Sequence, residues 1–282
     1  MSFLSKVFRY VNENGESITF TYNYGFLINK PVGIDTLQVS LSQATGIDQV
    51  GATIQSSNVQ PRQVTVSGIL VGEFVATNKE RLLSVVRPDL NAKLYADDYY
   101  LNVRPTSTPT IDPTGKFAKF QFSVLAAYPY WQKDDSAKVV LSGLQYMFKF
   151  PWNISREYQF AKLMETQFIN VPNRGQLPVP MTVTFYARGG CSNPKITNVN
   201  TGKIMLINKS LVAGERVVVE ITHERTYVTS SIDGDIRGAL SLKSTLNRLD
   251  VGDNVLKPEA EEGGNQLEVS IDFATEIVGI AL

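Results

Sequence analysis

The sequence predicts an all-β protein that contains a single helix. Short segments of alternating apolar and polar residues recur along the chain, turn residues separate them, and one segment stands out with helical capping and periodicity. The alternation is clearest in Leu267–Phe273, and it recurs in 120–124, 181–186 and 217–221. Because successive side chains of a strand point to opposite faces, this pattern is typical of strands with one buried face.

Turn residues stand where these strands should reverse. Asn14-Gly15 lies between two apolar-rich segments, 8–10 and 18–22, and Asp233-Gly234 repeats the signal later in the chain. A type I′ hairpin turn needs positive φ at both central residues, a conformation that Asn, Asp and Gly adopt most readily. The sequence therefore predicts hairpins at both places.

One helix is predicted from Thr77 to Arg87. Thr77 and Glu80 have the spacing of a capping box, in which both side chains satisfy free backbone N–H groups of the first turn. Apolar residues within 82–86 supply a buried face. Pro88 ends the helix because proline disfavours helical geometry at the residue before it.

The segment from Ser155 to Phe168 fits two structures. Its apolar residues follow a helical stripe, whereas 162–168 also fits an irregular strand. A strand is the interpretation adopted for this segment.

Two domains are predicted, 1–133 and 134–282. A chain of 282 residues is long enough for two domains, and the polar run 132–136 follows directly after the aromatic run 128–131. A long connection is predicted at 104–116, which is rich in Pro and Thr. Loops of this length inside a compact domain are often functional.

The charge balance argues against nucleic acid as the main ligand. Lys and Arg number 27, as do Asp and Glu, so the net charge is zero and there is no global attraction to phosphate or anionic lipid. Lys6 and Arg9 interrupt the apolar N-terminus, which argues against a signal peptide. No window reaches the length of a membrane helix. We expect a protein made in the cytoplasm that does not insert into membranes.

No residue pattern indicates catalysis, a cofactor or a metal ion. The single histidine, His223, ends a predicted strand, and the single cysteine, Cys191, stands among turn residues, so the sequence supplies no triad around either. Adjacent acidic pairs such as Asp97-Asp98 point to opposite faces of an extended chain and do not make a glycosidase site by themselves. Phosphate-binding loops and metal-ligand spacings are missing. We expect a protein that is not an enzyme and uses no cofactor.

Aromatic residues cluster around the predicted domain boundary, namely Tyr128, Tyr130, Trp131 and Trp152. Exposed aromatic rings stack on sugars, so a carbohydrate-binding module is an alternative function. Large aromatic residues usually belong to cores or interfaces, and that interpretation is preferred.

The order of these segments resembles the distal tail protein family (siphovirus-type tail component) of long-tailed bacteriophages over nearly the whole chain. In the first half the similarity lies in GIDTLQVS at 33–40, VTVSG at 64–68, RLL at 81–83, FQF at 120–122 and YPYW at 128–131. In the second half it lies in NPKI at 193–196, TG at 201–202, GE at 214–215, LDVGDN at 249–254 and the strand 267–273. The order of the motifs is the specific part of the resemblance.

The resemblance implies an N-terminal β-sandwich or split-barrel domain with one helix and a C-terminal galectin-like (jelly-roll) β-sandwich. It implies a structural protein of the virion tail tip or baseplate that forms a hexameric ring. The implied partners are the tail tube protein, a tail-associated fibre or lysin protein, and receptor-binding proteins on the outer domains. The alternatives are a carbohydrate-binding module of a host-adhesion device and a glycoside hydrolase or peptidase domain of a tail lysin.

The connection at 104–116 is the candidate assembly arm. Closing a ring requires complementary surfaces at two different edges of each subunit. Proline stiffens an extended segment, while Thr and Ser keep it soluble before it docks. We hypothesise that it reaches a neighbouring subunit or the tail-tube ring; a mobile surface hairpin is the alternative. The candidate residues are Arg104, Pro105, Thr106, Pro109, Pro113 and Lys116.

Overall fold

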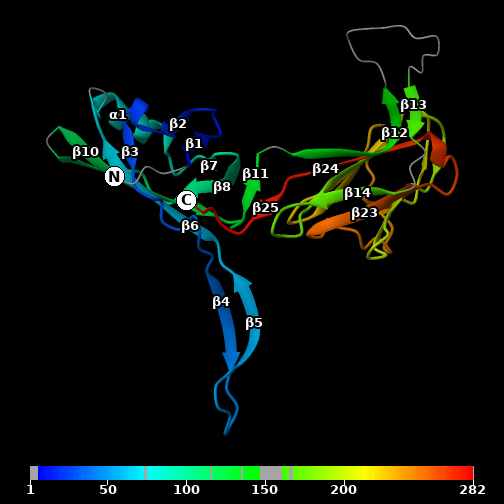
Figure 1. The fold of residues 1–282 in the computed structure, drawn as a ribbon, viewed down its shortest axis with the longest axis horizontal. Coiled ribbons are helices and arrows are strands. Elements are labelled where there is room, and N and C mark those ends of the chain that lie inside the picture. The colour runs from blue at the N-terminus through cyan, green and yellow to red at the C-terminus, as the bar shows by residue number, and fades with distance from the viewer. Residues whose placement is uncertain are drawn as a thin grey trace. The chain divides into compact units, whose positions relative to one another are not determined.

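A computed structural model describes residues 6–72, 75–114, 116–134, 136–146, 161–164 and 168–281 of the chain. The chain divides into two compact units. The first unit comprises Met1–Asp134 together with Glu276–Leu282, and the second comprises Asp135–Thr275. Within the described residues both units are built mainly from antiparallel strands, and one α-helix is present (Figure 1). The predicted all-β fold class is confirmed.

The first unit contains a ten-stranded sheet with the main strand order β2-β1-β7-β8-β10-β6-β3. Off this path, β9 pairs with β10, and β11 pairs with both β8 and β25. The bounds are β1 (Phe8–Asn12), β2 (Ser17–Phe20), β3 (Phe26–Ile28), β6 (Arg62–Leu70), β7 (Ala92–Ala96), β8 (Tyr99–Pro105), β9 (Thr110–Thr114), β10 (Phe117–Ala126), β11 (Trp131–Lys133) and β25 (Glu276–Ile277). The predicted hairpin at Asn14-Gly15 is confirmed, since β1 pairs with β2, but its type I′ turn is wrong, because Gly15 has a φ of 83° whereas Asn14 does not have a positive φ.

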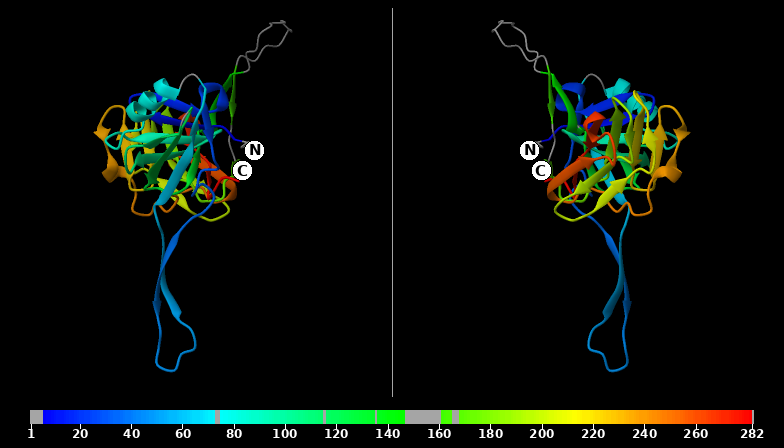
Figure 2. Two further views of the ribbon diagram at one scale, coloured as in Figure 1. Left: turned by 90° about the vertical axis from the view of Figure 1, so that its left-hand side faces the viewer. Right: turned by 90° about the vertical axis from the view of Figure 1, so that its right-hand side faces the viewer.

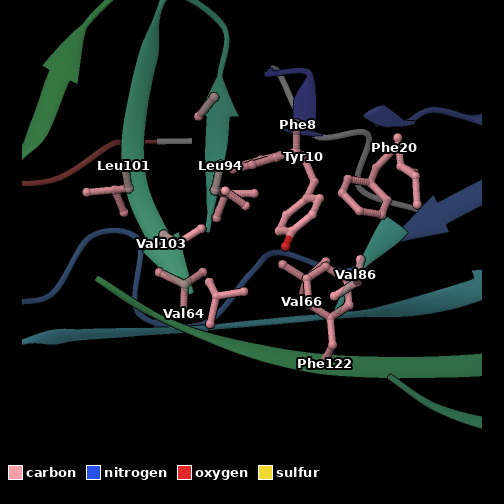
Figure 3. Close-up of a cluster of buried hydrophobic side chains, with 14 of the residues drawn as sticks. Phe8, Tyr10, Phe20, Val64, Val66, Val86, Leu94, Leu101, Val103 and Phe122 are labelled. Carbon is pink, nitrogen blue, oxygen red and sulfur yellow. The ribbon is translucent and has the colours of Figure 1, made fainter. Parts of the chain in front are cut away.

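The core of the first unit follows from the alternation of its strands. In β6 and β10 every second residue is buried, including Val66 and Phe122. Figure 3 shows Tyr10 of β1 pointing toward this layer, and the Tyr10 and Phe122 rings meet edge to face with centroids 6.0 Å apart. The Tyr10 hydroxyl is buried without a hydrogen-bond partner in the described part of the chain. Burial therefore raises the pKa of Tyr10 above its ordinary value.

The helix α1 spans Val75–Val85 and buries Leu82 and Val85 against the core. Its position confirms the predicted helix, but the predicted capping box at Thr77 and Glu80 is wrong, because Thr77 lies inside the helix. The helix starts earlier because Val75 also packs on the core and extends the apolar face.

The predicted long connection at 104–116 is largely structured. Arg104 and Pro105 end β8, and Thr110–Thr114 form β9, which pairs antiparallel with β10. The prediction of a structureless loop is therefore wrong. Proline is tolerated here because Pro105 and Pro113 lie at a strand end and in a short strand that pairs on one side among the described residues.

The second unit contains a seven-stranded sheet, β13-β12-β24-β15-β20-β21-β22, and a four-stranded sheet, β14-β23-β17-β18. The seven strands are β12 (Ala137–Tyr146), β13 (Ala161–Met164), β15 (Thr182–Ala187), β20 (Arg216–Ile221), β21 (Thr226–Ser230), β22 (Gly234–Asp235) and β24 (Leu267–Phe273). The four are β14 (Ile169–Asn173), β17 (Lys195–Asn198), β18 (Ile204–Leu206) and β23 (Gly252–Glu259), and a small pair is formed by β16 (Cys191–Ser192) and β19 (Ser210–Leu211).

Both large sheets contribute to one core in the second unit. Phe185 and Val269 come from the seven-stranded sheet, while Ile196 and Leu256 come from the four-stranded sheet, and all four are fully buried in the same cluster. This is the sandwich expected for the second half. Of the segment predicted as a strand from Ser155 to Phe168, Ala161–Met164 is a strand; residues 155–160 and 165–167 lie outside the described residues.

The chain enters and leaves the second unit through two neighbouring strands of the first. β25 pairs antiparallel with β11, so that Ile277 is opposite Trp131 and Glu276 is opposite Gln132. The division predicted at 133/134 assigned 276–282 to the second domain, whereas these residues lie in the first unit. The strand partner of β25 is far away in the sequence, and the sequence pattern around 276 carries no sign of it.

Candidate assembly surface

A two-stranded ribbon, β4 (Val39–Ala44) and β5 (Thr53–Val59), extends away from the sheet of the first unit (Figures 1 and 2). Among the described residues the two strands pair only with each other. At the base of the ribbon, the Gln60 N–H donates to the Gln38 carbonyl at 2.8 Å, and a bridge between Val32 and Thr65 joins the preceding segment to β6. The ribbon is therefore anchored at one end only.

One face of the ribbon carries four apolar side chains together with the polar Gln43 and Ser57, and it is called the apolar face. Val39 and Val59 are directly opposite each other, and Leu41 lies on the same face because it follows Val39 by two residues. An extra residue in β5 shifts the register and brings Ile54 opposite Gln43, on the same face. The four apolar side chains are exposed by between 36% for Val59 and 59% for Ile54.

The opposite face of the ribbon is polar and uncharged. It carries Ser40 opposite Asn58 and Ser42 opposite Ser56. Asp48 is the single charged residue between positions 39 and 59. The ribbon thus combines an apolar face with a neutral polar face, a pattern typical of a strand pair with one covered side.

Nothing among the described residues covers the apolar face. An isolated two-stranded hairpin is marginally stable in water, and exposed strands invite pairing with another chain. Removing the half-exposed apolar side chains from water would contribute roughly 1 kcal/mol each. The arrangement is suited to docking on another surface.

The candidate arm residues are held in the body of the first unit. The Arg104 Nε donates to the Pro88 carbonyl at 3.0 Å, and the Thr106 N–H and hydroxyl both donate to the Ser123 carbonyl, at 3.0 and 3.1 Å. Pro105 and Pro109 are buried. Arg104, Pro105, Thr106 and Pro109 thus contribute to packing and hydrogen bonding within the first unit.

The other two arm residues lie toward the end of the β9–β10 hairpin. Pro113 is exposed and opposite Ala118, and Lys116 is exposed in the turn. These two residues are exposed at the end of the hairpin.

Sequence reasoning missed the ribbon, although a signal was available. The stretch 39–59 combines alternation at Val39-Ser40-Leu41-Ser42 with a near absence of charge. Alternation predicts a strand with one covered face, but it does not tell whether the same chain supplies the cover.

Cys191 and His223, the two residues considered for catalysis, lie in a core and in a turn. Cys191 is buried in the apolar core of the second unit, and burial, followed by the nearby Glu215 carboxylate, raises the pKa of its thiol. A raised pKa disfavours the reactive thiolate. His223 lies in the turn in which the Thr222 hydroxyl donates to the Arg225 carbonyl at 2.9 Å.

Glu215 is a buried charge with several partners. Its carboxylate lies 2.5 Å from the Lys209 Nζ and accepts a 2.6 Å hydrogen bond from the Ser230 hydroxyl. The Val212 N–H also donates to it at 3.1 Å. Burial alone would raise the pKa of the Glu215 carboxyl, but the hydrogen bonds outweigh that effect and hold its pKa below the usual value. Within the described residues, no group of three or more His, Cys, Asp and Glu side chains is arranged to hold a metal ion.

The described aromatic residues of the cluster at the domain boundary are buried or partly buried. Trp131 is fully buried, and its indole N–H donates to the Ile34 carbonyl at 3.0 Å. Tyr128 is partly buried and donates to Glu276. Trp152 lies outside the described residues. In a separate finding, none of the helices among the described residues has the length and apolar character needed to cross a membrane.

Comparisons with known proteins find a similar family for most of the second unit. Residues 174–276 match the family model described as the siphovirus-type tail component, C-terminal domain. A search of curated protein sequences finds no match.

Solved structures share the fold of the chain. One is the Dit protein (gp 19.1) of phage SPP1, presented as a paradigm of the hub adsorption apparatus in phages that infect Gram-positive hosts. The two are similar with a TM-score of 0.68 and 15% identity, over 96% of this chain and 99% of that one. A second is a chain of the phage P2 baseplate in its activated conformation with calcium, with a TM-score of 0.50 and 8% identity, over 98% of this chain and 100% of that one. The resemblance to the distal tail proteins is thereby confirmed: residues 174–276 match the C-terminal domain of a siphovirus-type tail component, and the fold of the chain is similar to that of the Dit protein.

Proposed function

We propose that the chain is a structural hub protein of a phage tail tip or baseplate, and that it works by closing into a hexameric ring. The observation that carries the proposal is the uncovered apolar face of the β4–β5 ribbon, in a chain whose second unit matches a tail component domain. The resemblance to distal tail proteins supplies the number of subunits.

The occupant of the apolar face is a second copy of the chain. A ring is built from heterologous contacts, in which a projecting element of one subunit meets a different surface of the next. A ribbon held at one end has the reach for such a contact. Its near absence of charge removes electrostatic repulsion between like subunits, and the chain as a whole has a net charge of zero.

The ring joins the tail tube protein to a tail-associated fibre or lysin protein, and receptor-binding proteins attach to it. Its place is the virion tail. The protein carries out this role by shape and surface complementarity, with no reaction and no cofactor of its own. In a further part of the proposal, the exposed end of the β9–β10 hairpin, with Pro113 and Lys116, contacts a neighbouring subunit or the tail-tube ring.

The test replaces apolar ribbon residues by lysine. We expect Leu41→Lys with Ile54→Lys to abolish ring formation, because a charged side chain is costly to bury in an apolar contact. Light scattering on the purified protein should give a mass about six times that of one chain, 31.2 kDa, for the natural sequence and a single-chain mass for the variant. Negative-stain images should show rings with an axial hole for the natural sequence alone.

The matched control places the same two charges on the other face. Ser40→Lys with Ser56→Lys has the same chain length and net charge and should still form rings, and both variants should keep the thermal midpoint of the natural chain. Rings from the Leu41/Ile54 variant would contradict the role of the apolar face. A single-chain mass for the natural protein, both alone and mixed with its tail tube protein, would contradict the ring.

A further inference from the structure

A segment that follows the second unit in the sequence completes the first unit. We define the closing segment as residues 276–281, which begin with β25 and lie in the first unit although the second unit intervenes in the sequence. It pairs with β11 opposite Trp131 and Gln132. Ile280 is 2% exposed and belongs to the same core as Phe8 and Leu101. A residue synthesised after the whole second unit is thus a core residue of the first unit.

A buried arginine depends on this segment. Arg62 is 3% exposed, and its guanidinium donates to the carbonyls of Pro129 at 2.6 Å, Gly33 at 2.8 Å and Ile34 at 2.9 Å. A further bond reaches the carbonyl of Val278 in the closing segment. Burying a charge without its hydrogen-bond partners is strongly unfavourable. Without the closing segment, the Arg62 guanidinium loses the Val278 carbonyl as a partner and becomes more exposed to water.

The closing segment also supplies a buried acid and a tight backbone contact. Glu276 is 1% exposed and accepts hydrogen bonds from the Tyr128 hydroxyl at 2.6 Å and the Gln132 amide at 3.2 Å. A Cβ atom at Gly279 would lie 2.7 Å from the Asp35 carbonyl oxygen, so glycine is required for the approach. The Ile280 N–H donates to the Ile34 carbonyl at 3.1 Å.

We propose that the closing segment is a completion switch: the first unit becomes native only when residues 276–281 dock onto it, which is possible only after the second unit has been synthesised. Chains emerge from the ribosome N-terminus first, so the first unit must wait, with Arg62 and Trp131 incompletely covered, while the second unit is made. A subunit with an unfinished second unit therefore does not present a finished first unit. This inference concerns folding and does not depend on the proposed ring.

The first experiment ends the chain after Thr275. Trp152 is replaced by phenylalanine in all proteins, so that Trp131 alone reports on the first unit. We expect the truncated chain to show red-shifted Trp131 emission and a thermal midpoint of the first unit lower by about 10 °C or more. The second unit, followed by its own transition in circular dichroism, should be unchanged. A synthetic peptide of residues 274–282 should restore the emission of Trp131.

Two glycine variants test whether docking of the closing segment matters when no residue is removed from the chain. Gly279→Ala should lower the same midpoint because the new methyl group meets the Asp35 backbone, whereas Gly264→Ala in the second unit adds a methyl group in open space. An equal response of Trp131 to both variants would count against the proposal. The proposal would also be contradicted if the truncated chain had the same Trp131 emission and the same thermal midpoint of the first unit as the full chain.

The timing is tested on ribosome-bound chains. Full-length chains are stalled with either a short or a long C-terminal linker, so that 276–282 lies inside or outside the exit tunnel, and are treated briefly with protease. Protection of the first unit should appear with the long linker and be absent with the short one. Protection with both linkers would overturn the proposal, and it would leave the test of ring formation by the ribbon untouched.

Discussion

The Tyr128 hydroxyl donates a 2.6 Å hydrogen bond to the Glu276 carboxylate, although 148 residues separate the two in the chain. Glu276 is buried, so this bond is formed away from bulk water. Hydrogen bonds to charged groups contribute about 1.5–3 kcal/mol to stability. The contact therefore holds the returning C-terminal strand on the first unit.

Tyr128→Phe should lower the free energy of unfolding of the first unit by about 2 kcal/mol, because it removes one donor to a buried carboxylate. Urea unfolding followed by Trp131 fluorescence measures the change. Tyr22→Phe is the matched control, since Tyr22 is 68% exposed in the same unit. Equal midpoints for the two variants would refute the importance of this bond.

Tyr10→Phe should raise the stability of the first unit by about 1 kcal/mol, because a buried hydroxyl without a partner is destabilising. Thermal unfolding of the first unit is the measurement. Tyr24→Phe serves as the control, because Tyr24 is 58% exposed. A lower midpoint for Tyr10→Phe would mean that the hydroxyl contributes a favourable interaction.

The Glu215 cluster should make the second unit sensitive to acid. The pKa of Glu215 is lowered in the folded chain, so its contribution to stability is present above the unfolded value of about 4.5 and is lost as the pH falls through the lower folded value. The urea midpoint of the second unit should therefore drop between pH 6 and pH 3, as roughly estimated from this linkage. The Glu215→Gln variant should be less stable than the natural chain at neutral pH, and its urea midpoint should fall less as the pH is lowered.

Other carboxylates also titrate in this range. The quantity compared is therefore the difference in urea midpoint between the natural chain and the Glu215→Gln variant at each pH. Glu224→Gln is the control, because Glu224 is exposed in a turn of the same unit. Parallel pH curves for the natural chain and Glu215→Gln would exclude Glu215 as the source of the acid sensitivity.

Gly68→Ala should detach β3 from β6. A Cβ atom at Gly68 would collide with the carbonyl oxygen of Leu27 on the neighbouring strand. We expect a loss of about 2 kcal/mol or more in the stability of the first unit, because the backbone of β3 must move. Gln63→Ala, at an exposed site in the same strand, should change stability by less than about 0.5 kcal/mol. Hydrogen exchange of the β3 amides would show whether the pairing is lost.

Much of the fold could be predicted because the signal is local. Alternation in Leu267–Phe273 identifies β24 with its bounds, since each side chain reports its own burial. The helix was also predictable from its apolar face, but Val75 extended it beyond the expected cap. Turn chemistry at Asn14-Gly15 gave the first hairpin for the same reason.

The features that depend on distant partners could not be predicted. The segment 104–116 has the composition of a loop, and it becomes a strand because β10 offers a partner edge. The return of Glu276 to β11 is decided by Arg62, Tyr128 and Gln132, all far earlier in the sequence. The ribbon 39–59 was missed for a related reason: a pattern of alternation does not identify the chain that covers the apolar face.

The pairing of Gln132 with Glu276 brings the entry and exit points of the second unit next to each other in one ladder. A chain built this way can accept a different domain between those two positions without a change in the path of its first unit, because any domain whose own termini are close fits the same pair of attachment points. The second unit is then free to diversify in sequence and size while the first unit keeps its geometry.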